Sequence, residues 1–355
     1  MRETFVNLVL GVLLALMIGW ILVIGRPILL PLVSGMVLAY IVLGLAELFG
    51  RLPGIGGRLP ALARYVLSLG LIAAVVALLV WIVIGAFGQI AASAPQYEGR
   101  LLTQIQAWAT YFGFETEPTW RTLRDDVLRA VNLQRLLAVA VASASSLVAT
   151  AALVVIYAGF MVAERDRFAT KIARLSDVPA RIARIKGVIA DVNARIGAYL
   201  VLKTLINILL GSLSYAILRI AGVDFAGFWA ILIGLVNYIP YLGSFIGVFF
   251  PTVMAVVQFG ALGPVAALVA ALSAAQALVG NFIEPWLMGN SLNLSPLVIL
   301  VSLVVWTTIW GVPGAILAVP LMAILVIVLA EFPGSRPIAV LLSRDGDLGP
   351  PRGNG

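Results

Sequence analysis

Cysteine and histidine are both absent from this sequence of 355 residues. Their absence excludes disulfide bonds, thiol nucleophiles and imidazole acid–base catalysis, and it removes the side chains that hold most transition metals. Charged side chains are also scarce, at 11% of the residues, whereas 62% are hydrophobic. A water-soluble fold cannot bury this much apolar surface. We therefore expect no metal ion and no other cofactor, and a chain whose main partner is the lipid bilayer.

Apolar runs long enough to cross a bilayer follow one another along the chain. A spanning helix needs about 20 apolar residues to cross roughly 30 Å of hydrocarbon. The runs cover residues 5–24, 28–48, 65–90, 137–162, 199–220, 225–259, 262–283 and 294–330. The sequence thus predicts an all-α fold, a polytopic integral membrane helical bundle of about eight spans with broken or re-entrant helices in the C-terminal half.

Changes in composition predict six parts of the chain. Residues 91–136 hold five acidic and five basic residues, too many for a span, and residues 164–198 are strongly basic with an apolar helical stripe. That stripe predicts a helix on the membrane surface or against the bundle. The predicted parts are spans one to three (1–90), an extracytoplasmic helical segment (91–136), a fourth span (137–163), a basic cytoplasmic amphipathic linker (164–198), a C-terminal transport core with broken helices (199–331) and a disordered cytoplasmic tail (332–355).

The distribution of Lys and Arg predicts the orientation. With eight crossings, sixteen of the 23 basic residues face inward and seven face outward if both termini are cytoplasmic. Cytoplasmic loops of membrane proteins carry such an excess. We therefore expect a multi-pass protein of the bacterial inner membrane with cytoplasmic N and C termini. The same loops explain the net charge of +7, so we expect no nucleic-acid partner.

The charge rule gives no information between Asp224 and Ala330, where Lys and Arg are absent. Two apolar runs there are too long for one straight crossing and are interrupted by proline and glycine, so each is either a kinked span or a re-entrant hairpin. Broken helices at membrane depth are tolerated where they line a wet cavity, as in transporters. The predicted substrate-pathway residues are Asn237, Pro240, Tyr241, Gly243, Ser244, Asn281, Glu284, Pro285, Gly311, Pro313 and Gly314.

Two charged residues need separate interpretation. Glu284 is the only acid from Phe225 to Ala330, and a carboxylate near the membrane interior is a functional candidate. Glu284 either couples cations or protons, or simply ends a helix at the water interface before Pro285. Lys203 is expected to extend its ammonium toward the interface.

The C-terminal motifs are similar to those of a known family. The stretch from Gly234 to Gly243 (GLVNYIPYLG), the stretch from Asn281 to Gly289 (NFIEPWLMG) and the stretch from Trp310 to Gly314 (WGVPG) resemble, in order and spacing, the autoinducer-2 exporter family of bacterial permeases. The resemblance implies an inner-membrane transporter of about eight spans, as a homo-oligomer, whose namesake activity is export of a quorum-sensing furanone. Many relatives carry an acid just before the Gly-Asn pair, where this chain has Val279.

Three functions are compatible with the sequence. The first is a permease or exporter of a small polar solute, such as an autoinducer-2-like signalling molecule. The second is a sodium (cation)/proton antiporter that uses Glu284. The third is a non-transporting membrane scaffold, which the helix breaks disfavour because a scaffold gains nothing from unpaired backbone in lipid. No pair of intramembrane acids or nucleotide-binding loop is present, so we do not expect an enzyme.

Overall fold

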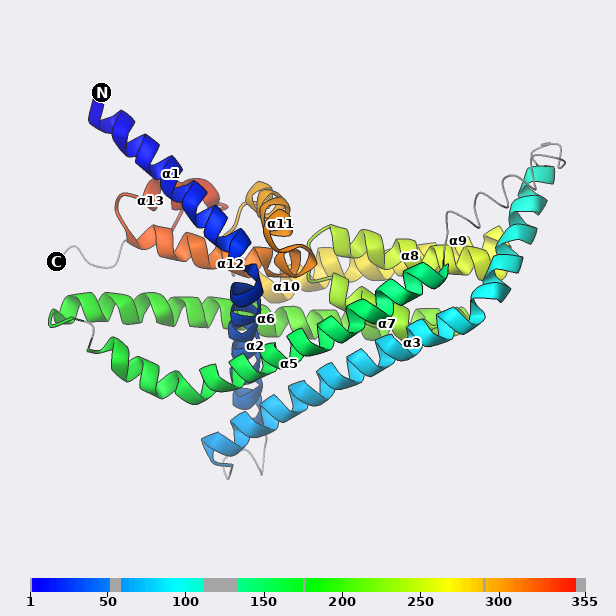
Figure 1. The fold of residues 1–355 in the computed structure, drawn as a ribbon, viewed down its shortest axis with the longest axis horizontal. Helices are drawn as coiled ribbons and strands as arrows, with labels where there is room; N and C mark the ends of the chain where they lie inside the picture. The colour runs from blue at the N-terminus through cyan, green and yellow to red at the C-terminus, as the bar shows by residue number, and fades with distance from the viewer. Residues whose placement is uncertain (1, 52–58, 112–132, 175, 290–291, 349–355) are drawn as a thin grey trace. The chain divides into compact units, whose positions relative to one another are not determined.

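The structure is a computed structural model that describes all residues except 1, 52–58, 112–132, 175, 290–291 and 349–355. Its described residues are mainly helical and contain no strand, only one isolated β-bridge between Leu294 and Ser343 (Figure 1). The elements in chain order are α1 (Arg2–Ile24), α2 (Arg26–Gly50), α3 (Ala61–Tyr111), α5 (Leu133–Ile172), α6 (Pro179–Ile220), α7 (Ala226–Val236), α8 (Leu242–Phe259), α9 (Leu262–Leu278), a π-helix (Val279–Ile283), α10 (Glu284–Met288), α11 (Pro296–Trp310), α12 (Val312–Glu331) and α13 (Arg336–Leu342).

The helices confirm the prediction of an all-α, polytopic membrane bundle. Among the described residues, seven helical stretches are long and apolar enough to cross a membrane. Three shorter apolar helices accompany them, covering Val9–Ile24, Ala226–Val236 and Pro296–Trp310. Each of the two long apolar runs of the C-terminal half is divided into two helices. The run 225–259 forms α7 and α8, and the run 294–330 forms α11 and α12.

The chain forms two compact units, which we describe separately. The first unit comprises Met1–Ile72, Ala151–Thr204 and Leu287–Gly355, and the second comprises Ala73–Thr150 and Leu205–Trp286. Helices α3, α5 and α6 each contribute residues to both units.

The core of the first unit is built around α12. Its buried residues Val319, Ala323 and Val326 pack with Ile196, and the cluster is completed by Tyr199, Leu200, Leu294 and Ala339. Ile196 belongs to the apolar stripe of the basic segment. This residue of the stripe is therefore buried in the unit, and from Pro179 onward the segment is part of α6, which runs unbroken to Ile220. Arg184 of the same segment pairs with Glu331 at the end of α12, at 3.5 Å.

The prediction of a disordered tail is wrong for its first part. Residues 336–342 form α13, and Ala339 is fully buried in the core of the first unit. The segment is held to the loop before α11, because Ser295 N–H donates to the Leu342 carbonyl at 3.3 Å and Asn293 Nδ2 donates to the Asp347 carbonyl at 2.7 Å. The apolar run Ile338–Leu342 supplies the buried surface that a disordered tail lacks.

Lys203, which the sequence predicts to extend toward the interface, is buried among protein side chains. Lys203 lies well inside the 42-residue helix α6, and only 4% of its surface is exposed.

Helix α3 continues without interruption to Tyr111, so its last part lies in the predicted extracytoplasmic segment; residues 112–132 of that segment lie outside the described residues. Within the second unit, Tyr97 Oη donates to Asp224 Oδ2 at 2.8 Å, and Asp224 N–H donates to Gln258 Oε1 at 2.8 Å. Gln104 Nε2 donates to the Val257 carbonyl at 3.0 Å. The extension of α3 is thereby joined to the turn before α7 and to the end of α8.

The Tyr97 contact predicts a pH dependence. Burial, followed by the hydrogen bond and the charge of Asp224, raises the pKa of Tyr97 from 10.0 to about 12, although Arg100 acts in the opposite direction. A raised pKa means that the folded state favours the protonated phenol, so this contribution to stability is complete below pH 10 and disappears as the pH rises toward about 12. We expect Tyr97→Phe to lower the thermal midpoint at neutral pH. The difference between wild type and variant should vanish above pH 12, and a difference constant to that pH would contradict the contact.

Candidate functional site

The first interrupted run is an antiparallel helical hairpin made of α7 and α8. The two helices pack against each other, and Ile233 lies beside Gly247, equally far from Pro240 along the chain. The 11 residues of α7 span only about 16 Å at 1.5 Å per residue, about half of the hydrocarbon thickness. The run is therefore a hairpin with its tip at Pro240, and the alternative of a kinked span is excluded for this segment.

The tip of this hairpin is a tight and strained turn. Leu242 N–H donates to the Pro240 carbonyl at 2.6 Å across Tyr241, whose φ is 62° and ψ −48°. These angles define the rare γ-turn with positive φ, which a bulky aromatic residue adopts only under strain. Gly243 follows in very close contact, since a Cβ there would lie 2.5 Å from the Val236 carbonyl oxygen. Proline, tyrosine and glycine thus shape the backbone at the tip, and strain of this kind gathers at functional sites.

A pair of buried amides lies at the same tip. Asn237 Nδ2 donates to Asn207 Oδ1 of α6 at 2.8 Å, and the two residues are 8% and 5% exposed. The approach is close because α6 and α7 meet through glycine, with a Cβ at Gly234 only 3.0 Å from the Asn207 carbonyl oxygen. Among the described residues, Asn207 Nδ2 is buried without a hydrogen-bond partner. A buried unsatisfied donor costs about 1–3 kcal/mol, so this group is available to an acceptor atom of a water or a solute.

The second predicted segment begins with a π-helix. Residues Val279–Ile283 form five residues of π-helix between α9 and α10, and Glu284 N–H donates to the Val279 carbonyl. Single π-turns occur often at functional sites. Asn281 lies within this turn and is exposed, Glu284 is half-buried at its end, and Pro285 follows in α10. The sequence alone did not indicate the π-turn.

The second interrupted run is also an antiparallel hairpin, formed by α11 and α12. Ser302 Oγ donates to the Ala318 carbonyl at 2.9 Å, and these residues are equally far from Trp310. A Cβ at Gly314 would clash with the Trp306 carbonyl oxygen, and Gly311 turns the chain at φ 68° and ψ −147°. Such angles are almost restricted to glycine.

This second tip is closed by tryptophan. Trp310 is 1% exposed, and its Nε1–H donates to the Leu22 carbonyl at the end of α1, at 3.0 Å. Gly311 faces Arg26 of α2, and Pro313 follows it at the start of α12. The Trp310–Gly314 break is thus packed against the corner between α1 and α2, within the first unit.

The predicted pathway residues fall into two groups. Residues of 237–244 and 281–285 belong to the second unit, whereas residues of 311–314 belong to the first. Asn207, which joins the first group, was missed by sequence reasoning; a lone amide in the middle of an apolar run was its only signal. Among the described residues, no group of three or more acidic side chains is positioned to hold a metal ion. The polar groups at the first tip are amides, a phenol and a hydroxyl, which bind by hydrogen bonds rather than by charge.

Similarity to known proteins identifies the family of this chain. The sequence profile described as AI-2E family transporter matches residues 10–334. The chain belongs to the AI-2E transporter family. Among its relatives, the AI-2 transport protein TqsA of Escherichia coli strain K12 is 28% identical over 94% of this chain and 96% of that protein. A putative transport protein of Haemophilus influenzae is 33% identical over 56% of this chain and 57% of its own length.

A further relative is also named as a transport protein. The putative transport protein YhhT of Escherichia coli strain K12 is 27% identical over 74% of this chain and 74% of that protein. The family and these relatives are transporters, so the chain is a membrane transporter of the permease or exporter type. Family membership therefore supports transport over the scaffold that the sequence left open.

Proposed function

We propose that this transporter carries a small, uncharged polar solute of the kind named for its Escherichia coli relative, AI-2, through the second unit. The route runs past the tip of the α7–α8 hairpin and the segment Asn281–Pro285. We further propose that it works in the bacterial inner membrane as a homo-oligomer with cytoplasmic termini. The observation that carries the solute class is the buried Asn207–Asn237 amide pair, which offers hydrogen bonds without charge at a helix break.

The hairpin tip and the π-helix are brought to one level by α8 and α9. These helices are consecutive and packed together, and Gly247 of α8 faces Gln276 of α9. The two helices are antiparallel, so a residue one turn before Gly247 in α8 lies level with a residue one turn after Gln276. This register puts Gly243 at the level of Gly280 and Asn281, which supports a route shared by both segments.

The proposal is tested with the purified chain in vesicles loaded with AI-2 or with a neutral sugar-like furanone of similar size. We expect AI-2 to leave vesicles that contain the protein faster than protein-free vesicles. The rate should saturate with concentration, because binding to the amide pair limits it. Equal rates in both vesicle preparations would contradict the proposed solute class.

Glu284 separates this proposal from cation/proton exchange. If the solute is neutral, Glu284→Gln keeps the shape of the side chain and should retain most of the AI-2 flux. Under the alternative hypothesis, exchange of sodium for protons needs the carboxylate of Glu284. Vesicles with the wild-type protein would then dissipate a pH gradient when sodium is added, and vesicles with Glu284→Gln would not. We expect no sodium-dependent dissipation from either protein, as followed by a pH-sensitive dye inside the vesicles.

A further inference from the structure

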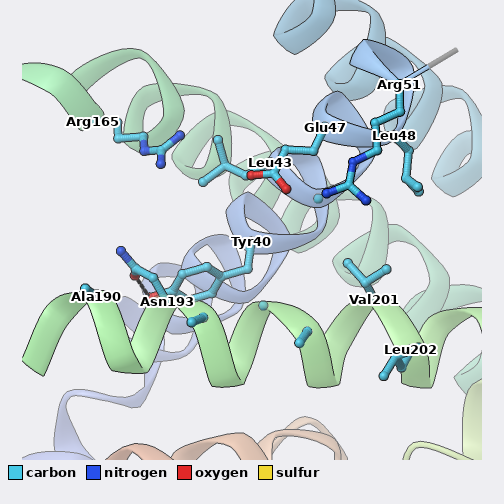
Figure 2. Close-up of a pocket in the computed structure, with 14 residues that line it drawn as sticks. Tyr40, Leu43, Glu47, Leu48, Arg51, Arg165, Ala190, Asn193, Val201 and Leu202 are labelled. Atoms are coloured by element: carbon cyan, nitrogen blue, oxygen red, sulfur yellow. Dashed lines mark hydrogen bonds between the residues drawn. The ribbon is translucent and has the colours of Figure 1, made fainter. Parts of the chain in front are cut away.

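A charged cavity lies in the first unit, and none of the predicted pathway residues lines it. Its volume is about 700 Å³, and its walls are one face of α2, one face of α6 and Arg165 of α5 (Figure 2). The α6 face is open because small residues line it, among them Ala194, Gly197 and Ala198. A Cβ at Gly197 would meet no other atom within 4 Å. The cavity is thus a consequence of missing side-chain volume, in the size range of small-molecule sites.

Three charged side chains surround this space. Glu47 lies in the last turn of α2 and Arg51 directly follows the end of that helix. Figure 2 shows the carboxylate of Glu47 and the guanidinium of Arg51 extending into the space that Arg165 borders from α5. Glu and Arg at this spacing pair readily on a helix. Within the described part of the chain, none of the three side chains is engaged in a salt bridge. Two cations and one anion therefore remain available to a ligand.

Two uncharged polar side chains of the cavity bond to each other. Tyr40 Oη donates to Asn193 Oδ1 at 2.7 Å, and this bond links α2 to α6 (Figure 2). Leu43, Val201 and Leu202 supply apolar surface beside this pair. The cavity thus combines a charged edge with an apolar wall, and it suits a ligand whose charged groups are attached to a less polar body.

The charges define the ligand's chemistry. Two guanidinium groups are the usual partners of a phosphate, since their planar N–H donors match its oxygens. A carboxylate beside them disfavours a simple polyanion and favours a ligand that carries a cation next to its phosphate. A primary ammonium satisfies Glu47 with N–H donors, whereas a quaternary ammonium offers none and is bound best by an aromatic cage.

We propose that this cavity binds a phosphoethanolamine group, with the phosphate held by Arg51 and Arg165 and the primary ammonium held by Glu47. The group can belong to a membrane aminophospholipid or to a soluble phosphoethanolamine ester. The site is independent of the proposed solute route, because its residues lie in the first unit and the amide pair lies in the second.

The first test compares lipids with identical acyl chains and different headgroups. The full-length protein in detergent receives phosphatidylethanolamine or phosphatidylcholine, and the thermal midpoint and bound lipid are measured, the latter by native mass spectrometry. We expect phosphatidylethanolamine to bind more tightly. Arg51→Ala and Arg165→Ala should each weaken binding by about tenfold, since a hydrogen bond to a charged group is lost. Glu47→Gln should remove the preference for ethanolamine over choline.

Arg167→Ala is the matched control, because Arg167 is exposed on the same helix as Arg165 and does not line the cavity. This variant should bind phosphatidylethanolamine like the wild type. Competition with soluble glycerophosphoethanolamine distinguishes a soluble ester from a membrane phospholipid as the natural ligand. If it displaces bound phosphatidylethanolamine at equal concentration, the ligand is a soluble ester. If it does not, the ligand is the phospholipid. Equal binding of both lipids to the wild type, or an unchanged preference in Glu47→Gln, would overturn the proposal.

Discussion

Asn237→Ala is expected to lower AI-2 flux by about ten- to hundredfold while the protein remains folded. The substitution removes the donor to Asn207 Oδ1 and leaves this buried oxygen without a partner, as Nδ2 of the same residue already is, at a cost of about 1–3 kcal/mol. If the same amides bind the solute during passage, this loss appears in the transport rate at about tenfold for each 1.4 kcal/mol. The measurement is efflux from vesicles containing equal amounts of monodisperse protein.

Thr252→Val is the control for this experiment. Thr252 lies in α8, and its hydroxyl donates to the Val248 carbonyl of the same helix at 2.7 Å. Removing that hydroxyl leaves no buried polar group without a hydrogen-bond partner. The flux of this variant should therefore stay at the wild-type value. An Asn237→Ala variant that transports as fast as Thr252→Val would remove the amide pair from the route.

Substitution of Gly243 is expected to have the other large effect. A Cβ at this position would lie 2.5 Å from the Val236 carbonyl oxygen and 2.7 Å from the Asn237 Cα, both of them backbone atoms. Even Gly243→Ala must therefore displace α8 from α7, and overpacking of this kind costs about 1–3 kcal/mol. Gly243→Leu should displace the tip further and abolish flux. Thermal midpoints and efflux rates of both variants give the measurement.

Gly263→Leu provides the comparison, because a Cβ at Gly263 in α9 would meet no other atom within 4 Å. This variant should keep the wild-type midpoint and flux. The Ala variant at position 243 keeps the test decisive even if the Leu variant does not fold. Wild-type midpoint and flux in Gly243→Ala would mean that the close contact at the hairpin tip does not exist.

The membrane class and the positions of the helix breaks were predictable from the sequence. Length and hydropathy identify spans directly, because a bilayer requires about 20 apolar residues and tolerates no unpaired backbone in lipid. Pro240 and Gly311 marked the breaks, since proline removes a backbone donor and glycine allows the positive φ of 68° found at Gly311. These are local properties that a single sequence expresses.

The hairpins themselves were not predictable, because the information lies in contacts between distant residues. Charge could not decide between a kinked span and a hairpin where Lys and Arg are absent, from Asp224 to Ala330. The contact of Ile233 with Gly247 and the bond from Ser302 to Ala318 decide it. The hydrogen bond between Asn207 and Asn237 depends on the packing of α7 against α6, which the sequence does not reveal.

The charged cavity was missed for a similar reason. Glu47 and Arg51 resemble ordinary residues at the end of a span, and Arg165 resembles one basic residue among many in a cytoplasmic linker. Cytoplasmic orientation alone explains basic residues at these places in the sequence. Only the structure shows that the three side chains line a cavity, which the small side chains of α6 leave open.

The absence of cysteine permits a direct test of the central claim, that the α7–α8 hairpin tip lines a hydrated route. A single cysteine replaces either Ser244, at the tip, or Phe249, an exposed apolar residue of α8. The rate of modification by a water-soluble, membrane-impermeant thiol reagent is measured in vesicles, because thiols react as thiolates and lipid disfavours that charge. Ser244→Cys should react at least tenfold faster than Phe249→Cys, and AI-2 should protect it. Equal rates at both positions, or a Ser244→Cys rate unaffected by AI-2, would contradict the account.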